Sequence, residues 1–198
     1  MSESIRQILG VFATALTIIG YLPYLYDCYK GKTTPHFFSW SLWTLSNTIV
    51  FFFLLLEGGG PAAWPIGMMS IMFSFTLYFS LQAKSRKRIK KVDILLFIIG
   101  LLAIPIWLIA DNPLIAISIV SLIELAAFIP TLRKTIEFPF EETLSSYAIA
   151  AFKYSLILII LDQYSLKLLV NPIMWWIINV GFALLIIYLR KNKNARIA

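Results

Sequence analysis

Seven apolar windows constrain the fold of this chain more than any other feature. Each is roughly 17–22 residues long, the length that an α-helix needs to cross the hydrocarbon core of a bilayer. Open strands would leave backbone groups unpaired in lipid, so each window predicts a helix. The windows lie at residues 8–26, 37–56, 62–81, 94–110, 113–132, 144–161 and 169–189. The sequence therefore predicts an all-α membrane protein with seven transmembrane helices.

The composition agrees with this class and excludes several functions. Of the 198 residues, 60% are hydrophobic and 14% are charged, which is far from the average of soluble domains. The net charge of +7 does not indicate nucleic-acid binding, because the basic residues lie in loops beside apolar windows. Cys28 is the single cysteine and His36 the single histidine, so neither a disulfide framework nor an ordinary His/Cys metal cluster is expected. No nucleophile–base pair stands out, and we expect no enzyme, no catalytic residues and no cofactor.

The chain contains an internal repeat. A shift of 107 residues places Pro23 on Pro130 and Pro65 on Pro172, and it aligns several apolar positions without a gap. We interpret the first three windows and the last three as two copies of one unit, joined by the fourth window. Three helices start and end on opposite sides of the membrane, so one linker helix gives both copies the same orientation. This 3+1+3 arrangement assigns residues 1–83 to the first repeat, 84–111 to a basic loop and linker helix, and 112–198 to the second repeat and a basic tail.

Lysine and arginine are unevenly distributed between the two sides of the predicted bundle. Fourteen lie on the side that holds the 1–2, 3–4 and 5–6 loops and the C-terminus, against Arg6 and Lys167 on the other side. The positive-inside rule then predicts a cell-membrane protein with an outside N-terminus and a cytoplasmic C-terminus. Six basic residues lie within positions 84–91, and we expect this loop to contact anionic lipids.

Two ionisable residues are predicted at mid-membrane depth. Glu124 lies near the middle of the fifth predicted helix and Lys153 near the middle of the sixth. A lone charge in hydrocarbon costs about 3 kcal/mol or more, so we predict that both face the protein interior and one another. Two interpretations stay open: a substrate-binding or proton-linked pair, and a structural salt bridge between neighbouring helices.

Two predicted helices carry a tryptophan and an asparagine one turn apart. Trp43 and Asn47 share a face of the second helix, and Trp175 and Asn179 share a face of the seventh. An aromatic ring beside an amide can stack on a small polar solute and hydrogen-bond to it, so these residues predict a substrate-binding pocket. The alternative is that the tryptophans belong to the interfacial belt and the asparagines bond between helices.

Prolines interrupt corresponding helices of the two repeats. Pro23 and Pro130 each remove a backbone hydrogen bond and allow a kink. A kink at similar depth in both repeats predicts a pair of hinges for a gate. The alternative is a static bend that shapes the bundle.

Together these features resemble the PQ-loop superfamily and, within it, the sugar-transporting SWEET proteins. The resemblance rests on the 3+1+3 layout, the outside N-terminus, and a proline, a basic turn and a second proline at Pro23, residues 30–34 and Pro35. Pro130 and Pro139 form the second set. The resemblance implies a transporter in which these four prolines belong to the hinges and the gate.

The predicted function is a uniporter or proton-linked carrier for a small polar solute such as a sugar, an amino acid or a vitamin. The alternative is a receptor or sorting protein on the same scaffold, similar to the KDEL receptors and without net transport. A retinal-type protein would need a lysine on the seventh helix, whereas Lys153 lies on the sixth. The expected partners are the solute, the bilayer and anionic lipids, and not nucleic acid; a homo-oligomer is left open.

Overall fold

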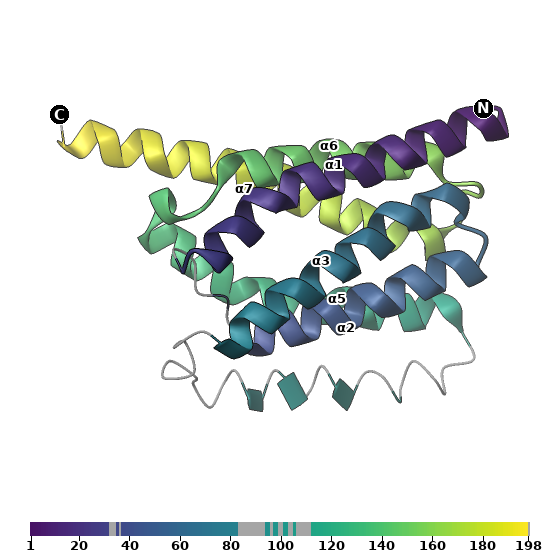
Figure 1. The fold of residues 1–198 in the computed structure, drawn as a ribbon, viewed down its shortest axis with the longest axis horizontal. Coiled ribbons are helices and arrows are strands. Elements are labelled where there is room, and N and C mark those ends of the chain that lie inside the picture. Colours follow the sequence, from purple (N-terminus) through teal and green to yellow (C-terminus); the bar gives the residue numbers. More distant parts are fainter. Residues whose placement is uncertain are drawn as a thin grey trace.

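The structure, a computed structural model, forms a bundle of long helices (Figure 1). It describes residues 1–31, 35, 37–82 and 112–197, and between the last two ranges residues 94, 95, 97, 98, 101, 102 and 105. The six long helices of the described part are α1 (Glu3–Tyr29), α2 (Phe37–Leu56), α3 (Ala63–Gln82), α5 (Pro113–Glu137), α6 (Leu144–Ile160) and α7 (Leu166–Ile197). Two short 3-10 helices, η1 (Gly60–Ala62) and η3 (Pro139–Glu141), precede α3 and α6.

These six helices coincide with six of the predicted windows. The bounds of α2 are those predicted, whereas α7 begins at Leu166, three residues before its window, and continues into the basic tail as far as Ile197. The predicted linker helix at 94–110 and the basic loop at 84–91 lie mostly or wholly outside the described residues. The residues described there, from 94 to 105, have helical backbone.

Local capping explains where two of the helices begin. At the start of α1, the Ser2 hydroxyl accepts a hydrogen bond from the backbone N–H of Ile5 at 3.4 Å. At the start of α5, Asn112 Oδ1 accepts from the backbone N–H of Leu114 at 2.9 Å. Pro113 stands at the first helical position, where no backbone N–H is needed. These contacts satisfy donors that have no partner within the helix.

The lengths and surfaces of the helices are those of an all-helical membrane protein. Five helices are long and apolar enough to cross a bilayer, and α6, with 17 residues, lies at the lower limit. Large apolar side chains such as Ile19, Leu122 and Ile177 are exposed on the outer faces. Such surfaces are stable against lipid, which is as apolar as they are.

The helices form two groups, which we call the first bundle (α1–α3) and the second bundle (α5–α7). Within the first bundle α3 packs against both α1 and α2, and within the second α7 packs against both α5 and α6. Between the bundles, α1 contacts α6 and α2 contacts α5. The N-terminus and the C-terminus lie at opposite ends of the molecule (Figure 1).

A small-residue face on α1 allows one of these contacts to be close. Gly10, Ala13, Thr17 and Gly20 are buried on α1, where Gly10 lies against Pro61 and Trp64, and Gly20 lies against α6. A methyl group on Gly20 would lie 2.8 Å from Ile149 Cγ2 of α6, too short for a real contact. Small residues of this kind let two membrane helices approach until their backbones nearly touch.

The main apolar core joins the two bundles. It includes a fully buried residue from each of five helices: Val50, Ile66, Val120, Ile157 and Leu168. Trp175, one of the polar-cluster residues described next, packs against this core.

Candidate functional site

A buried polar cluster lies between α2, α5 and α7. Its centre is the carboxylate of Glu124, which lies near the middle of α5 and is 1% exposed. Glu124 Oε1 accepts a hydrogen bond from Asn47 Nδ2 at 3.1 Å. Glu124 Oε2 accepts from Asn171 Nδ2 and from Trp175 Nε1, each at 2.7 Å. Donors from both bundles therefore meet at one carboxylate.

On α2, helical spacing brings two residues to the cluster. Trp43 and Asn47 are one turn apart and face α5 together. Asn47 Nδ2 also donates to the backbone oxygen of Trp43 at 3.1 Å, which holds the amide in place. Trp43 Nε1 donates to the backbone oxygen of Glu124 at 3.4 Å. The first bundle thus contacts both the side chain and the backbone of Glu124.

On α7, Asn171 and Trp175 have the same spacing. Both donate to Glu124, and Asn171 Nδ2 lies 3.1 Å from Ser121 Oγ, one turn before Glu124 on α5. We call these six residues the Glu124 cluster: Trp43, Asn47, Ser121, Glu124, Asn171 and Trp175.

The chemistry of the cluster suits a carboxylate that has no cation beside it. The two hydrogen bonds to Oε2, each 2.7 Å long, are shorter than the 3.1 Å bond to Oε1. A carboxylate offers about four acceptor positions, and three are filled here by N–H donors. Oε1 accepts from Asn47 Nδ2, and the buried Ser46, next to Asn47 on α2, also directs its hydroxyl to the carboxyl group of Glu124.

Lys153 is buried in a different environment. It is 1% exposed, and its Nζ has no hydrogen-bond partner in the described part of the chain. The Tyr154 ring centroid lies 4.4 Å away. The predicted contact between Glu124 and Lys153 is therefore wrong for this structure: both side chains are buried, but no ion pair joins them. The neutral donors of Asn47, Asn171 and Trp175 replace it.

The structure brings together Trp43, Asn47, Glu124 and Trp175 of the six residues predicted for the pocket. Asn179 is buried on α7, but its Nδ2 donates to the backbone oxygen of Trp175 at 2.7 Å, within its own helix. Asn171 lies within the predicted seventh helix but is not among the predicted site residues, because the tryptophan–asparagine pattern takes the asparagine four residues after each tryptophan, and Asn171 lies four residues before Trp175. Its spacing of four residues from Trp175 is the signal that identifies it.

The four predicted hinge and gate prolines lie near the end of the bundle opposite the N-terminus. α1 and α5 continue as helices beyond Pro23 and Pro130, to Tyr29 and Glu137. Pro35 is buried in the connection that precedes α2. Pro139 is buried at the start of η3, and its carbonyl accepts a hydrogen bond from Arg190 Nε of α7 at 3.0 Å.

At the end that holds the N-terminus, two ion pairs join the two bundles. Arg6 of α1 contacts Asp162 of the α6–α7 loop at 2.7 Å. Lys167 of α7 contacts Glu57, which follows α2. Gly60 has a φ of 59° and lies so close to the Asp162 carboxylate that a side chain there would collide with it. Charge and backbone contacts thus close this end of the boundary.

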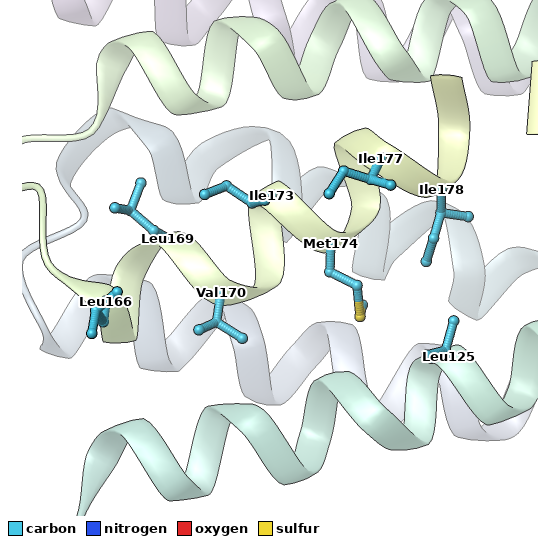
Figure 2. Close-up of a pocket in the computed structure, with 8 residues that line it drawn as sticks. All are labelled: Leu125, Leu166, Leu169, Val170, Ile173, Met174, Ile177 and Ile178. Atoms are coloured by element: carbon cyan, nitrogen blue, oxygen red, sulfur yellow. The ribbon is translucent and has the colours of Figure 1, made fainter. Parts of the chain in front are cut away.

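A separate apolar groove lies between α5 and α7 (Figure 2). Its volume is about 570 Å³, and Leu125 and Met174 point from the two helices into the space between them. The lining is entirely apolar: Leu125, Leu166, Leu169, Val170, Ile173, Met174, Ile177 and Ile178. These side chains offer no hydrogen bond to a polar solute, so the groove is a poorer candidate site than the Glu124 cluster.

Among the described residues, no group of three or more His, Cys, Asp or Glu side chains is arranged to hold a metal ion. Comparisons with protein-family models, curated proteins and solved structures find no match. The functional interpretation therefore rests on the geometry and chemistry of the Glu124 cluster.

Proposed function

We propose that the protein is a membrane transporter, a uniporter or proton-linked carrier, that moves a small polar solute between its two bundles. The Glu124 cluster is the observation that carries this proposal. Ionisable groups at mid-membrane depth are costly to keep in lipid and usually serve transport or binding. The donors to Glu124 come from Asn47 in the first bundle and from Asn171 and Trp175 in the second. Any relative movement of the bundles would therefore rearrange the site.

The pattern of helix contacts supports two repeats of the same orientation. Exchanging α1 with α5, α2 with α6, and α3 with α7 converts the α1–α3 contact into α5–α7 and α2–α3 into α6–α7. The same exchange converts the α1–α6 contact into α5–α2. Repeats related by an axis along the membrane normal have this property, and substrate sites of such transporters lie at the repeat boundary. We therefore retain the SWEET-like 3+1+3 arrangement, with residues 84–111 as the linker.

In this proposal the two ends of the boundary act as gates. The ion pairs Arg6–Asp162 and Glu57–Lys167 hold the end near the N-terminus closed. Pro23 and Pro130 are the hinges of the opposite, cytoplasmic gate, with Pro35 and Pro139 in the adjoining connections. The uneven distribution of basic residues supports an outside N-terminus in the cell membrane.

The solute is proposed to bind at the Glu124 cluster by donating a hydrogen bond to the carboxyl group of Glu124. Trp43 and Trp175, which donate to the backbone oxygen and to Oε2 of Glu124, supply aromatic surface, as is usual in sites for small solutes. Asn179, one turn after Trp175, is retained as a further solute contact in a conformation that frees its amide from the backbone.

The test is uptake by the pure protein in liposomes. Solutes that raise the melting temperature are first selected from sugars, amino acids and vitamins, and their uptake is followed with and without a proton gradient. Glu124→Gln should reduce uptake by about tenfold, because the amide has a single acceptor oxygen and in either orientation its NH2 group faces an N–H donor, that of Asn47 or those of Asn171 and Trp175.

Glu137→Gln is the matched control, since Glu137 is exposed at the end of the same helix. Its uptake should equal that of the wild type. If a solute binds tightly but never accumulates in the liposomes, the carrier proposal is wrong. A receptor without net transport would then explain the binding.

A further inference from the structure

Both helix contacts between the bundles carry a buried ionisable residue near their middle. Glu124 of α5 lies at the contact with α2, where Asn47 bonds to it. Lys153 of α6 lies one turn after Ile149, which packs against Gly20 of α1. Residues four apart share a helix face, so Lys153 lies on the side of α6 that faces α1. The two groups therefore occupy the two halves of the same boundary.

Glu124 and Lys153 differ in their hydrogen-bond partners. Glu124 accepts three hydrogen bonds, whereas Lys153 Nζ, equally buried, has none from the described residues. An ammonium group carries three donors, and in a buried position these need acceptors. The face of the Tyr154 ring, 4.4 Å from Nζ, attracts a cation but accepts no conventional hydrogen bond from it here.

Neither of the nearby polar systems supplies the missing anion. The carboxylate of Glu124 is directed to Asn47, Asn171 and Trp175 and makes no ion pair with Lys153. The acidic residues Glu57 and Asp162 are engaged with Lys167 and Arg6 at the end of the bundle. An anion that neutralises Lys153 would therefore come from outside the described chain.

We propose that Lys153 binds the carboxylate of the transported solute, so that the substrates are small organic carboxylates. This inference rests on the proposed function, because it treats the boundary between the bundles as the solute path. A carboxylate matches the ammonium in charge and supplies the acceptors that Nζ lacks. Neutral sugars and neutral vitamins leave the ammonium unsatisfied, so the proposal narrows the predicted solute classes to acids, amino acids included.

The experiment compares carboxylates with their own amides. Thermal unfolding of the detergent-solubilised protein is followed by tryptophan fluorescence in the presence of L-lactate, L-alanine and L-serine, and of lactamide, L-alaninamide and L-serinamide. At a saturating concentration we expect at least one carboxylate to raise the melting temperature by about 3 °C or more, and its amide to have no effect. Lys153→Met should abolish the shift.

Lys191→Met is the matched control. The substitution removes the same charge as Lys153→Met, but Lys191 is exposed near the C-terminal end of α7. It should keep the full shift. The proposal is overturned if the amides act as strongly as the carboxylates, if Lys153→Met retains the shift, or if none of the carboxylates has an effect on the wild type. If Lys153→Met fails to fold, the comparison of each carboxylate with its amide on the wild-type protein still tests the proposal.

Uptake measurements separate this inference from the proposed function. If a neutral sugar accumulates in proteoliposomes while carboxylates neither bind nor accumulate, the transporter proposal stands and the role of Lys153 is wrong. If a carboxylate binds in a Lys153-dependent way but is never taken up, the anion site stands and the transporter proposal is wrong.

Discussion

At the scale of single residues, neutral hydrogen-bond donors stabilise a buried carboxylate where a salt bridge was expected. A buried ion pair repays the cost of burying its two charges only if the two groups meet in good geometry, and Lys153, although buried, makes no contact of this kind with Glu124. Amide and indole N–H groups are cheaper to bury, and Asn47, Asn171 and Trp175 already stand on helices that pack against α5 or share its boundary. Lys153 is consequently left available for another role.

Asn171 and Asn179 provide a matched pair to test this arrangement. Both are buried on α7, but Asn171 donates to Glu124, whereas Asn179 donates to its own helix backbone. Asn171→Leu should lower the free energy of unfolding by about 1.5–3 kcal/mol, the value of a hydrogen bond to a charged group. Asn179→Leu should cost about 1 kcal/mol or less.

Thermal unfolding in one detergent, followed by tryptophan fluorescence, measures both variants. Equal losses would show that Glu124 does not depend on Asn171. Adding Glu124→Leu to Asn171→Leu provides a further check, because it removes the carboxylate that Asn171 serves. The loss caused by Asn171→Leu should then become smaller, as expected for residues in direct contact.

The sequence predicts which residues belong to the Glu124 cluster better than it predicts the hydrogen bonds between them. Helical spacing identifies Trp43, Asn47 and Trp175, and the cost of a charge in lipid identifies Glu124 as inward-facing. Which donor reaches Glu124 depends on the register of α2 and α7 against α5, which no single helix specifies. Asn171 is absent from the prediction although it lies within the predicted last helix, because the pattern considers only the asparagine one turn after each tryptophan, and Asn171 lies one turn before Trp175.

At the scale of helices, two kinds of contact hold the bundles together. Along its length α1 approaches α6 through small residues such as Gly20, and at the end near the N-terminus charged residues join the bundles. Packing between small residues is short-ranged, whereas partly exposed ion pairs are weak and reversible. The charged contacts are therefore the ones suited to open and close.

Loss of both ion pairs should open this end. In a Cys28→Ser background, Thr17→Cys places a single thiol on the buried face of α1. Adding Asp162→Asn and Glu57→Gln should speed its modification by a charged methanethiosulfonate reagent by about tenfold. The two ion pairs together stabilise the closed end by roughly 1–2 kcal/mol. Their loss can therefore raise the ratio of open to closed molecules by about tenfold.

Glu3→Gln is the control for this experiment. Glu3 is an exposed acid in the first turn of α1, and its carboxylate accepts a hydrogen bond from Gln7 in the same helix. It should leave the modification rate unchanged. An equal rate in the variant without the ion pairs would show that these pairs do not govern access.

At the scale of the whole molecule, hydrophobic patterning predicts the helices but not their neighbours. A helix must satisfy its own backbone in lipid, so the apolar windows locate α2, α3 and α5 within one residue at their first positions. The pairing of α1 with α6, and of α2 with α5, depends on the shapes of distant faces, such as Gly20 against Ile149. The repeat suggests such symmetry, but it specifies none of the contacts.

The orientation of the molecule in the membrane gives the last prediction. The N-terminus at the start of α1 and the C-terminus at the end of α7 lie at opposite ends of the bundle (Figure 1), so the termini should lie on opposite sides of the membrane. Fourteen basic residues lie on the predicted cytoplasmic side, against Arg6 and Lys167 on the other. Those two are engaged with Asp162 and Glu57, so the outer end carries almost no unpaired positive charge to oppose translocation.

Single cysteines placed at the two ends test this orientation in a Cys28→Ser background. Ser4 and Asn192 are both exposed and lie near the two ends of the chain. An impermeant maleimide should label Ser4→Cys on intact cells, and Asn192→Cys only after the cells are permeabilised. The reverse pattern would invert the orientation and place the ion-paired end in the cytoplasm. Labelling of both positions on intact cells would mean that the chain crosses the membrane an even number of times, which contradicts the seven-helix arrangement.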